Sequence, residues 1–221
     1  MCGRFVFFGV DNLNSRFNID YETNLNIKPS YNISPSKEFP VIYKKEKILI
    51  EYMKWGLIPS WTKELDLKKI IINARSETLY DKPAFKSLIK KKRCLIPSNG
   101  FYEWKLEDRK KIPYYISLKN NSIFAFAGLY DSWIDGLGTE NKTFTIITTK
   151  SNSLVETIHS RMPVILVNKN EERWLDENID NSESIIDMLK PYNPGEMKIE
   201  RVSMNVNNPG NDYFDLIKSV S

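Results

Sequence analysis

Residues 93–133 read RCLIPSNGFYEWKLEDRKKIPYYISLKNNSIFAFAGLYDSW, and this stretch decides the fold. It divides into runs rich in aromatic and β-branched side chains at residues 93–98, 100–106, 111–119 and 123–133. Such runs are typical of strands, and the charged or Asn/Gly residues between them are typical of turns. The pattern therefore predicts a series of short strands in the middle of the chain.

The same strand pattern extends in both directions, with a few helical segments inserted between the strands. Two of the strands flank Glu46 as a hairpin. The further strands are expected at residues 3–8, 39–45, 47–55, 143–150 and 162–167, and helices at 78–91, 151–157, 168–176 and 182–189. This order predicts an α+β fold with a strongly curved, barrel-like antiparallel sheet and peripheral helices. Because no repeat or linker divides it, we expect one domain over residues 1–221.

Composition favours a monomeric cytoplasmic protein. The chain is 41% hydrophobic and 27% charged, which is ordinary for a globular protein. It has neither an apolar run long enough for a membrane helix nor the pattern of a secretion signal. The two cysteines are too few for a disulfide scaffold, so we expect Cys2 as a free thiol and Cys94 as a buried core residue.

The charge is unevenly distributed along the chain. Residues 171–190 hold seven acidic and two basic side chains, a net charge of −5, so the remainder sums to +9 against the total of +4. A basic body with a separate acidic segment is compatible with a polyanion partner. A solvated lysine-rich surface explains the same numbers equally well.

The opening stretch MCGRFVFF places a cysteine directly behind the initiator methionine. If Met1 is removed, Cys2 carries an α-amine with a pKa of about 7.7–8.0 and a thiol with a pKa of about 8.5 on adjacent carbons. Together they form a 1,2-aminothiol, which condenses with an aldehyde to an imine and then closes to a thiazolidine ring. The alternative is that Cys2 is an incidental second residue.

Two titratable residues are candidates for acid–base chemistry. His159 is the only histidine, and it lies just before an apolar strand that starts at Met162. Its side chain suits proton transfer near neutrality, although a lone histidine can also be structural. Glu103 shares a strand face with Phe101, and a carboxylate near apolar groups has a raised pKa. An ordinary edge-strand glutamate is the alternative.

Two further motifs fit nucleic-acid chemistry. In INARSET (72–78), the amide of Asn73 and the guanidinium of Arg75 can bind an oxygen and a phosphate, or the amide can simply satisfy a turn. In WGLIPSW (55–61), the indoles either belong to the core or form a stacking platform for bases. The chain contains no phosphate-binding glycine loop, no HExxH and no typical zinc-ligand set. We therefore expect neither metal nor cofactor.

These pieces together resemble the SRAP family, the SOS response-associated peptidases, which include abasic-site sensor proteins that cross-link to single-stranded DNA. The resemblance covers residues 2–167 and continues more weakly through RVSMNVNNPGND near 201–212. It rests on the ordered motifs MCGRF, YNISPS, WGLIPSW, INARSET, CLIPSNGFYEWK, ITT and IHSRMPVIL.

The resemblance implies a single α+β domain that acts on abasic sites in single-stranded DNA during the DNA damage response, without metal or cofactor. It places the catalytic positions at Cys2, Asn73, Glu103 and His159. Cys2 would form the thiazolidine, His159 would protonate the sugar ring oxygen, Asn73 would hold sugar oxygens, and Glu103 would accept a proton from the Cys2 ammonium. The expected DNA contacts are Arg4, Trp55, Arg75, Thr148 and Arg161.

Two other activities remain open at this stage. Cys2 can serve as the nucleophile of a thiol peptidase that removes its own leader. Alternatively, the chain is a non-enzymatic module that binds single-stranded DNA, with Cys2 incidental. We expect the protein to associate with the nucleoid when bound to DNA, and the acidic segment to lie away from the DNA.

Overall fold

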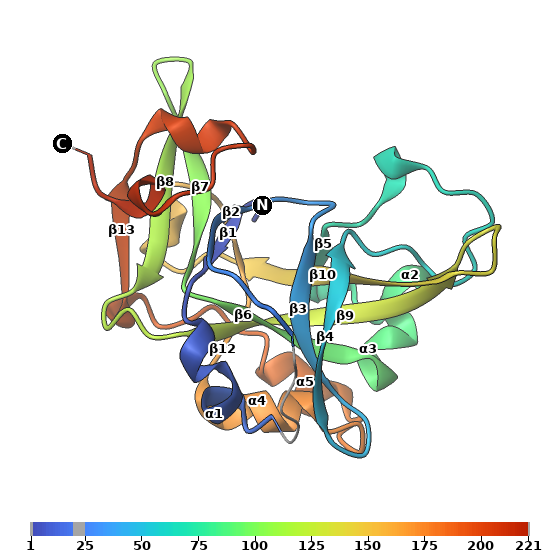
Figure 1. Ribbon diagram of the computed structural model, residues 1–221. Helices are drawn as coiled ribbons and strands as arrows, with labels where there is room; N and C mark the ends of the chain where they lie inside the picture. The colour runs from blue at the N-terminus through green and yellow to red at the C-terminus, as the bar shows by residue number, and fades with distance from the viewer. Residues whose placement is uncertain (1, 20–24, 221) are drawn as a thin grey trace.

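The computed structural model describes residues 2–19 and 25–220, and its centre is a closed barrel (Figure 1). Around the barrel the strands follow the order β10, β4, β3, β6, β9 and back to β10. The β10–β4 pair is parallel and the other barrel pairs are antiparallel. The expected α+β fold with a barrel-like sheet is confirmed, although the barrel is mixed. Its strands are β3 (Glu38–Lys44), β4 (Ile48–Trp55), β6 (Arg93–Ser98), β9 (Phe124–Ile134) and β10 (Glu140–Lys150).

Three short strands extend the barrel sheet beside its longest members. The second half of β10 pairs in parallel with β5 (Asn73–Arg75) and antiparallel with β11 (Arg161–Pro163). β12 (Ile165–Leu166) pairs with β9. Because β5 and β11 both pair with the second half of β10, the INARSET and IHSRMPVIL motifs each place a strand beside it.

A second sheet stands against the barrel, in the order β13, β8, β7, β1, β2. The chain passes from the barrel strand β6 into this sheet at Asn99. The backbone N–H of Asn99 donates to the carbonyl of Val6, and its side chain accepts from the backbone N–H of Phe8. The next residue, Gly100, has no room for a side chain, because a Cβ there would lie 2.4 Å from the ring of Tyr115. The strands are β1 (Phe5–Phe7), β2 (Ser30–Ile33), β7 (Gly100–Glu107), β8 (Lys110–Leu118) and β13 (Met197–Arg201).

The second sheet separates two hydrophobic cores, as the alternation along its strands predicts. Phe5 and Phe101 point into the main core, which fills the barrel. Val6 and Tyr102 point to the other side, into a small core that the C-terminal segment covers with Val206 and Leu216. A residue on the Phe101 side of β7 therefore faces the junction of sheet and barrel.

The helices are short and peripheral. They are α1 (Leu13–Phe17), α2 (Pro83–Lys86), α3 (Leu88–Lys91), α4 (Asn168–Leu175) and α5 (Ser182–Asp187), with 3₁₀ turns η1 (Val10–Asn12), η2 (Leu67–Lys69), η3 (Ser76–Thr78), η4 (Val155–Thr157), η5 (Pro194–Glu196), η6 (Met204–Asn207) and η7 (Phe214–Ile217). No helix among the described residues is long and apolar enough to cross a membrane.

Two predicted helices differ from the structure. The expected helix over 78–91 is wrong, because the segment forms η3, a turn, and then α2 and α3 as separate helices. Pro83 begins α2; it has no backbone N–H and cannot continue a helix from residue 78. The expected helix over 151–157 is only the single 3₁₀ turn η4. The acidic helices α4 and α5 form as expected and lie with α1 at the end of the barrel opposite the β7–β8 hairpin (Figure 1).

Candidate active site

Cys2 lies immediately before β1 and is fully buried in the main core. Its Sγ is 3.8 Å from the carbonyl oxygen of Arg4. Burial raises the pKa of the thiol strongly, and the nearby carboxylate of Glu103 raises it further. The thiol is therefore neutral at physiological pH. The prediction that Met1 is removed falls outside the described residues.

Asn73 at the start of β5 holds Cys2 in place. Its Nδ2 donates to the Cys2 carbonyl at 2.8 Å. Its Oδ1 is buried and has no hydrogen-bond partner among the residues that the structure describes. A buried amide acceptor without a partner costs stability, so its retention indicates a use. The side chain thus positions Cys2 and keeps one acceptor beside it.

Glu103 lies on the Phe101 side of β7, with only 3% of its surface exposed. Burial raises the pKa of its carboxyl group, and the proximity of His159 offsets part of the rise. A carboxyl group with a raised pKa can both take and return a proton near neutrality. The charge of Glu103 raises the pKa of the Cys2 thiol, and His159 lowers the pKa of Glu103, so the three groups interact electrostatically.

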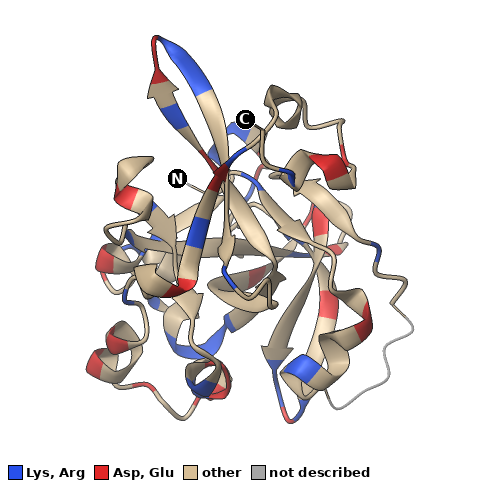
Figure 2. Ribbon diagram, turned by 90° about the vertical axis from the view of Figure 1, so that its left-hand side faces the viewer, with Lys and Arg blue, Asp and Glu red and all other residues tan. Residues whose placement is uncertain are grey.

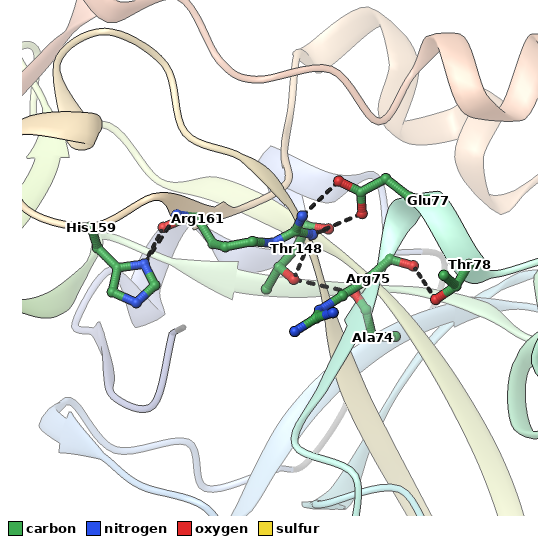
Figure 3. Close-up of polar contacts among 7 residues, drawn as sticks. All are labelled: Ala74, Arg75, Glu77, Thr78, Thr148, His159 and Arg161. Carbon is green, nitrogen blue, oxygen red and sulfur yellow. Dashed lines mark hydrogen bonds and ion pairs between the residues drawn. The ribbon is translucent and has the colours of Figure 1, made fainter.

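His159 precedes β11 and is half-buried. The backbone N–H of Arg161 donates to its Nδ1 at 3.0 Å (Figure 3). The carbonyl oxygen of Arg161 lies 3.2 Å from the same nitrogen, so Nδ1 can either accept from the N–H or, when protonated, donate to the carbonyl. The backbone of Arg161 thus holds the ring by its Nδ1 side.

A cleft of about 630 Å³ lies between the second sheet and the loop before β11, and neither Cys2 nor Asn73 is among its lining residues. Glu103 and His159 line it, together with Gly3 and Arg4 behind Cys2. The four predicted catalytic positions thus come from four separate segments and are brought together. The remaining lining residues are Trp104, Lys111 and Asn207.

Sequence reasoning missed these last three. Trp104 directly follows Glu103, and its Nε1 donates to Asn207 at 2.7 Å, which joins the C-terminal segment to the cleft. Lys111 belongs to the basic β7–β8 hairpin, which projects beyond the rest of the molecule with its lysine and arginine residues (Figure 2). Tryptophan next to a predicted site residue was the available signal for Trp104. For Asn207 the available signal was the RVSMNVNNPGND motif near 201–212, in which it lies.

Two of the predicted DNA-contact residues are buried, and those predictions are corrected here. Trp55 has no exposed surface; its ring stacks on Phe144 and its Nε1 donates to the Ile72 carbonyl at 2.9 Å. It belongs to the core and presents no face to a base. Thr148 is also fully buried, and its hydroxyl lies between the Ala74 carbonyl and the Arg161 guanidinium. It supports the site from within.

The three predicted arginines differ in their surroundings. Arg4 is partly buried and donates to Asn32 Oδ1 at 2.7 Å and to the Val206 carbonyl at 2.9 Å. Arg161 is held by Glu77. Arg75 is exposed, and its guanidinium points away from Glu77 (Figure 3). Of the three, Arg75 is the most available for a phosphate.

The described residues contain no group of three or more His, Cys, Asp or Glu side chains that could hold a metal ion. What the cleft does offer is a thiol, a carboxyl group, an imidazole and an amide. This set can carry out proton transfer and nucleophilic addition.

Comparison with known proteins identifies the family. The family model described as SOS response associated peptidase (SRAP) matches residues 1–209. The chain belongs to the SRAP family. The resemblance noted from the sequence motifs is thereby confirmed.

Relatives of this SRAP protein cover its whole length. The abasic site processing protein YoqW of Bacillus subtilis is 43% identical over 223 residues, covering 99% of this chain and all of that protein. The abasic site processing protein HMCES of Xenopus tropicalis is 33% identical, covering 87% of this chain and 67% of that protein. A crystal structure from Bacteroides thetaiotaomicron superposes with a TM-score of 0.90 at 30% identity, covering all of both chains.

Proposed function

We propose that this SRAP protein captures abasic sites in single-stranded DNA as a covalent thiazolidine at Cys2. The observation that carries the proposal is that Cys2, hydrogen-bonded to Asn73, directly precedes Gly3 in a cleft that Glu103 and His159 also line. Relatives that match over their full length are named abasic site processing proteins. An abasic deoxyribose opens to an aldehyde, which is the partner that a 1,2-aminothiol requires.

The reaction proceeds in two bond-forming steps after Met1 has left. The Cys2 amine adds to the C1′ aldehyde and releases one water, giving an imine. The Cys2 sulfur then bonds to C1′, the C=N π electrons move to nitrogen, and the thiol proton is transferred to that nitrogen. The product is a thiazolidine whose mass is the sum of protein and DNA less one water.

The neighbouring side chains have distinct roles in this scheme. Glu103, with its raised pKa, accepts a proton from the Cys2 ammonium and returns it later. The imidazolium form of His159 gives a proton to the ring oxygen as the sugar opens, and the neutral imidazole remains. The free Oδ1 of Asn73 accepts a hydrogen bond from a sugar hydroxyl. Positioned acid–base groups of this kind typically contribute about 10²–10⁴-fold in rate.

The burial of the site favours a single strand as the substrate. Cys2 is fully buried and Glu103 is almost fully buried, so the sugar must leave any helical stack to reach them. A strand without a partner does so without losing base pairs. Arg75 and Arg4 are then placed to hold phosphates, which gives binding that depends on salt and little on sequence. We expect a monomer acting on damaged DNA in the cytoplasm, at the nucleoid.

A Cys2→Ser variant tests the chemistry. It keeps the α-amine and loses the sulfur, so it can form an imine but no thiazolidine. With an abasic oligonucleotide, we expect a heat-stable adduct from the native protein without any reductant. The serine variant should give a stable adduct only after borohydride reduction. A heat-stable adduct from the unreduced serine variant would refute ring closure by the thiol.

A thiol peptidase that cleaves before Cys2 is the second candidate, favoured by the description of the family. Its difficulty is the raised pKa of the Cys2 thiol, because peptidase chemistry requires the thiolate. A precursor with added residues before Cys2 should mature by itself if this activity exists. The matching Cys2→Ala precursor should then keep its extension.

A further inference from the structure

Arg4 is held on one side of its guanidinium by uncharged oxygens. Its Nη1 donates to Oδ1 of Asn32 at 2.7 Å and to the carbonyl of Val206 at 2.9 Å. No carboxylate among the described residues forms an ion pair with it, whereas Arg161 is paired with Glu77. Because its acceptors are neutral, Arg4 is oriented while its positive charge is not cancelled.

The amide of Asn32 on β2 can face Arg4 in only one way. Its side chain is buried, and its Nδ2 lies 2.8–3.2 Å from the carbonyl oxygens of Val206, Asn208 and Asn211. Only the NH₂ end of an amide can donate to carbonyls, so Oδ1 must point to Arg4. The YNISPS and RVSMNVNNPGND motifs, which had no assigned role, thus meet at this amide.

The anchored Nη1 leaves the opposite edge of the Arg4 guanidinium for a ligand. On that edge the N–H of Nε and one N–H of Nη2 are parallel, and such a pair of donors matches two oxygens of a phosphate. No described residue accepts a hydrogen bond from either nitrogen, and Arg4 lines the cleft. A two-donor edge with an uncancelled charge is therefore left for an anion.

We propose that Asn32 is a positioning residue that holds Arg4 so that its Nε–Nη2 edge binds a DNA phosphate beside the abasic sugar. The C-terminal segment 203–211 takes part, because its carbonyls fix the amide of Asn32. The phosphate as the ligand rests on the function proposed above. The holding of Arg4 by Asn32 does not.

Rotation of the Arg4 guanidinium tests the anchor without DNA. In ¹⁵N-labelled protein, slow rotation about the Nε–Cζ bond gives separate Nη1 and Nη2 signals, and their loss in Arg4→Lys identifies those of Arg4. Asn32→Leu should raise their exchange rate about tenfold or more, because the charged group loses one of its two acceptors. An unchanged rate in folded N32L protein would overturn the proposal.

The matched control is Thr143→Val. It also removes a buried hydrogen bond, the one that Thr143 accepts from the Ile58 N–H at 2.9 Å, and Thr143 forms no hydrogen bond with Arg4. T143V should leave the exchange rate and the affinity for DNA native. A change in T143V equal to that in N32L would show that general loosening is the cause, and would overturn the proposal.

Asn32→Asp tests the need for an uncharged acceptor, and it also serves if N32L fails to fold. It keeps an oxygen for Nη1 and adds a negative charge, so Arg4 should still rotate slowly while the affinity for DNA falls. Native affinity in N32D would contradict the proposal, because the charge of Arg4 would then not be needed for the phosphate.

Binding is measured with an oligonucleotide that carries a tetrahydrofuran abasic analogue, which has no aldehyde and cannot be cross-linked. Arg4→Ala should lower the affinity about fivefold at about 0.1 M salt, as a salt slope reduced by about 0.7 implies. N32L should lower it roughly two- to fivefold in the native background and not further in the R4A background. An equal further loss in R4A would make Asn32 merely structural.

These measurements separate the proposal from the proposed function. If rotation and binding change as expected but the native protein does not capture a reactive abasic oligonucleotide, the role of Asn32 stands and the thiazolidine function fails. If capture succeeds but R4A binds the analogue as tightly as the native protein, the function stands and this proposal is overturned.

Discussion

Glu103 is the clearest case of a buried residue whose ionisation lowers the stability of the folded protein. It is almost fully buried, and burial raises its pKa. A raised pKa means that the folded state binds the proton more tightly than the unfolded state does. The stability gained from this proton is complete below the unfolded pKa of about 4.3 and is lost as pH rises through the folded pKa.

Glu103→Gln should therefore stabilise the protein at neutral pH while abolishing efficient capture of abasic DNA. Glutamine fills the same space without ionising, so its advantage over the native protein should grow from about pH 4 upward. Calorimetric melting temperatures between acid and pH 8 would measure it. A difference between the two proteins that does not change with pH would contradict the buried charge as the cause.

Trp55, in contrast to Glu103, stabilises the folded protein as part of the core. Trp55→Ala should lower the free energy of unfolding by about 3–5 kcal/mol, as expected for a large cavity in the core. Trp61, from the same WGLIPSW motif, is 56% exposed, and Trp61→Ala should stay within about 0.5 kcal/mol of the native protein. Denaturant unfolding curves compare the two; equal losses would contradict the burial pattern.

Among the elements, the peripheral helices depend on one buried side chain of the barrel. Arg93 on β6 donates to the Ile89 carbonyl at the end of α3 at 2.7 Å, and also to Trp174 and Asp176 at the end of α4. A guanidinium satisfies carbonyls that the helix ends leave without partners. It thus ties the helices α3 and α4 to the sheet.

Arg93→Met should cost about 3 kcal/mol or more, because several carbonyls lose a charged donor in a buried place. The matched control is Arg173→Met on the exposed side of α4, with an expected change within about 0.5 kcal/mol. Chemical denaturation of both variants tests this. An R93M protein as stable as the native protein would show that α3 and α4 stay packed on the barrel without the Arg93 hydrogen bonds.

The strands were the elements most accessible to prediction. Residues 93–98 form β6 as predicted, and the hairpin around Glu46 is β3–β4, because alternation and turn residues act locally. β2, β5 and β13 were missed, since these strands of three to five residues depend on their pairing with β1, β10 and β8. The predicted strand over 162–167 is two strands, β11 and β12, on different partners.

At the scale of the whole molecule, local sequence patterns could not predict that the barrel closes. It depends on the parallel pairing of β10 with β4, in which Phe144 is the partner of Trp55, far away in the sequence. The four predicted catalytic positions were candidates by residue type, and the motif resemblance grouped them; only the fold explains why Asn73 reaches Cys2 and why Glu103 and His159 line one cleft. The ion pair between Arg161 and Glu77 likewise joins residues that are distant in the sequence.

The charge of the molecule is separated in space as well as in sequence. The acidic helices α4 and α5 lie away from the basic β7–β8 hairpin, which leaves the cleft, lined by Arg4 and Lys111, on the basic side (Figures 1 and 2).

Arg75→Ala should weaken binding to single-stranded DNA and reduce the slope of log K against log salt by about 0.7. Lys47→Ala, in the exposed β3–β4 turn, should leave the slope unchanged. Equal slopes in fluorescence titrations of native and R75A proteins would show that Arg75 does not contact the DNA phosphates.

The central claim is that a free Cys2 amine and thiol capture the aldehyde of an abasic site. The most direct measurement is the intact mass of products after incubation with a single-stranded abasic oligonucleotide and denaturing electrophoresis. The native protein, Cys2→Ala and a variant with one residue retained before Cys2 would be compared. The account predicts a heat-stable adduct, at the summed mass less one water, for the native protein alone. No adduct from native protein whose mass confirms the loss of Met1 would contradict it.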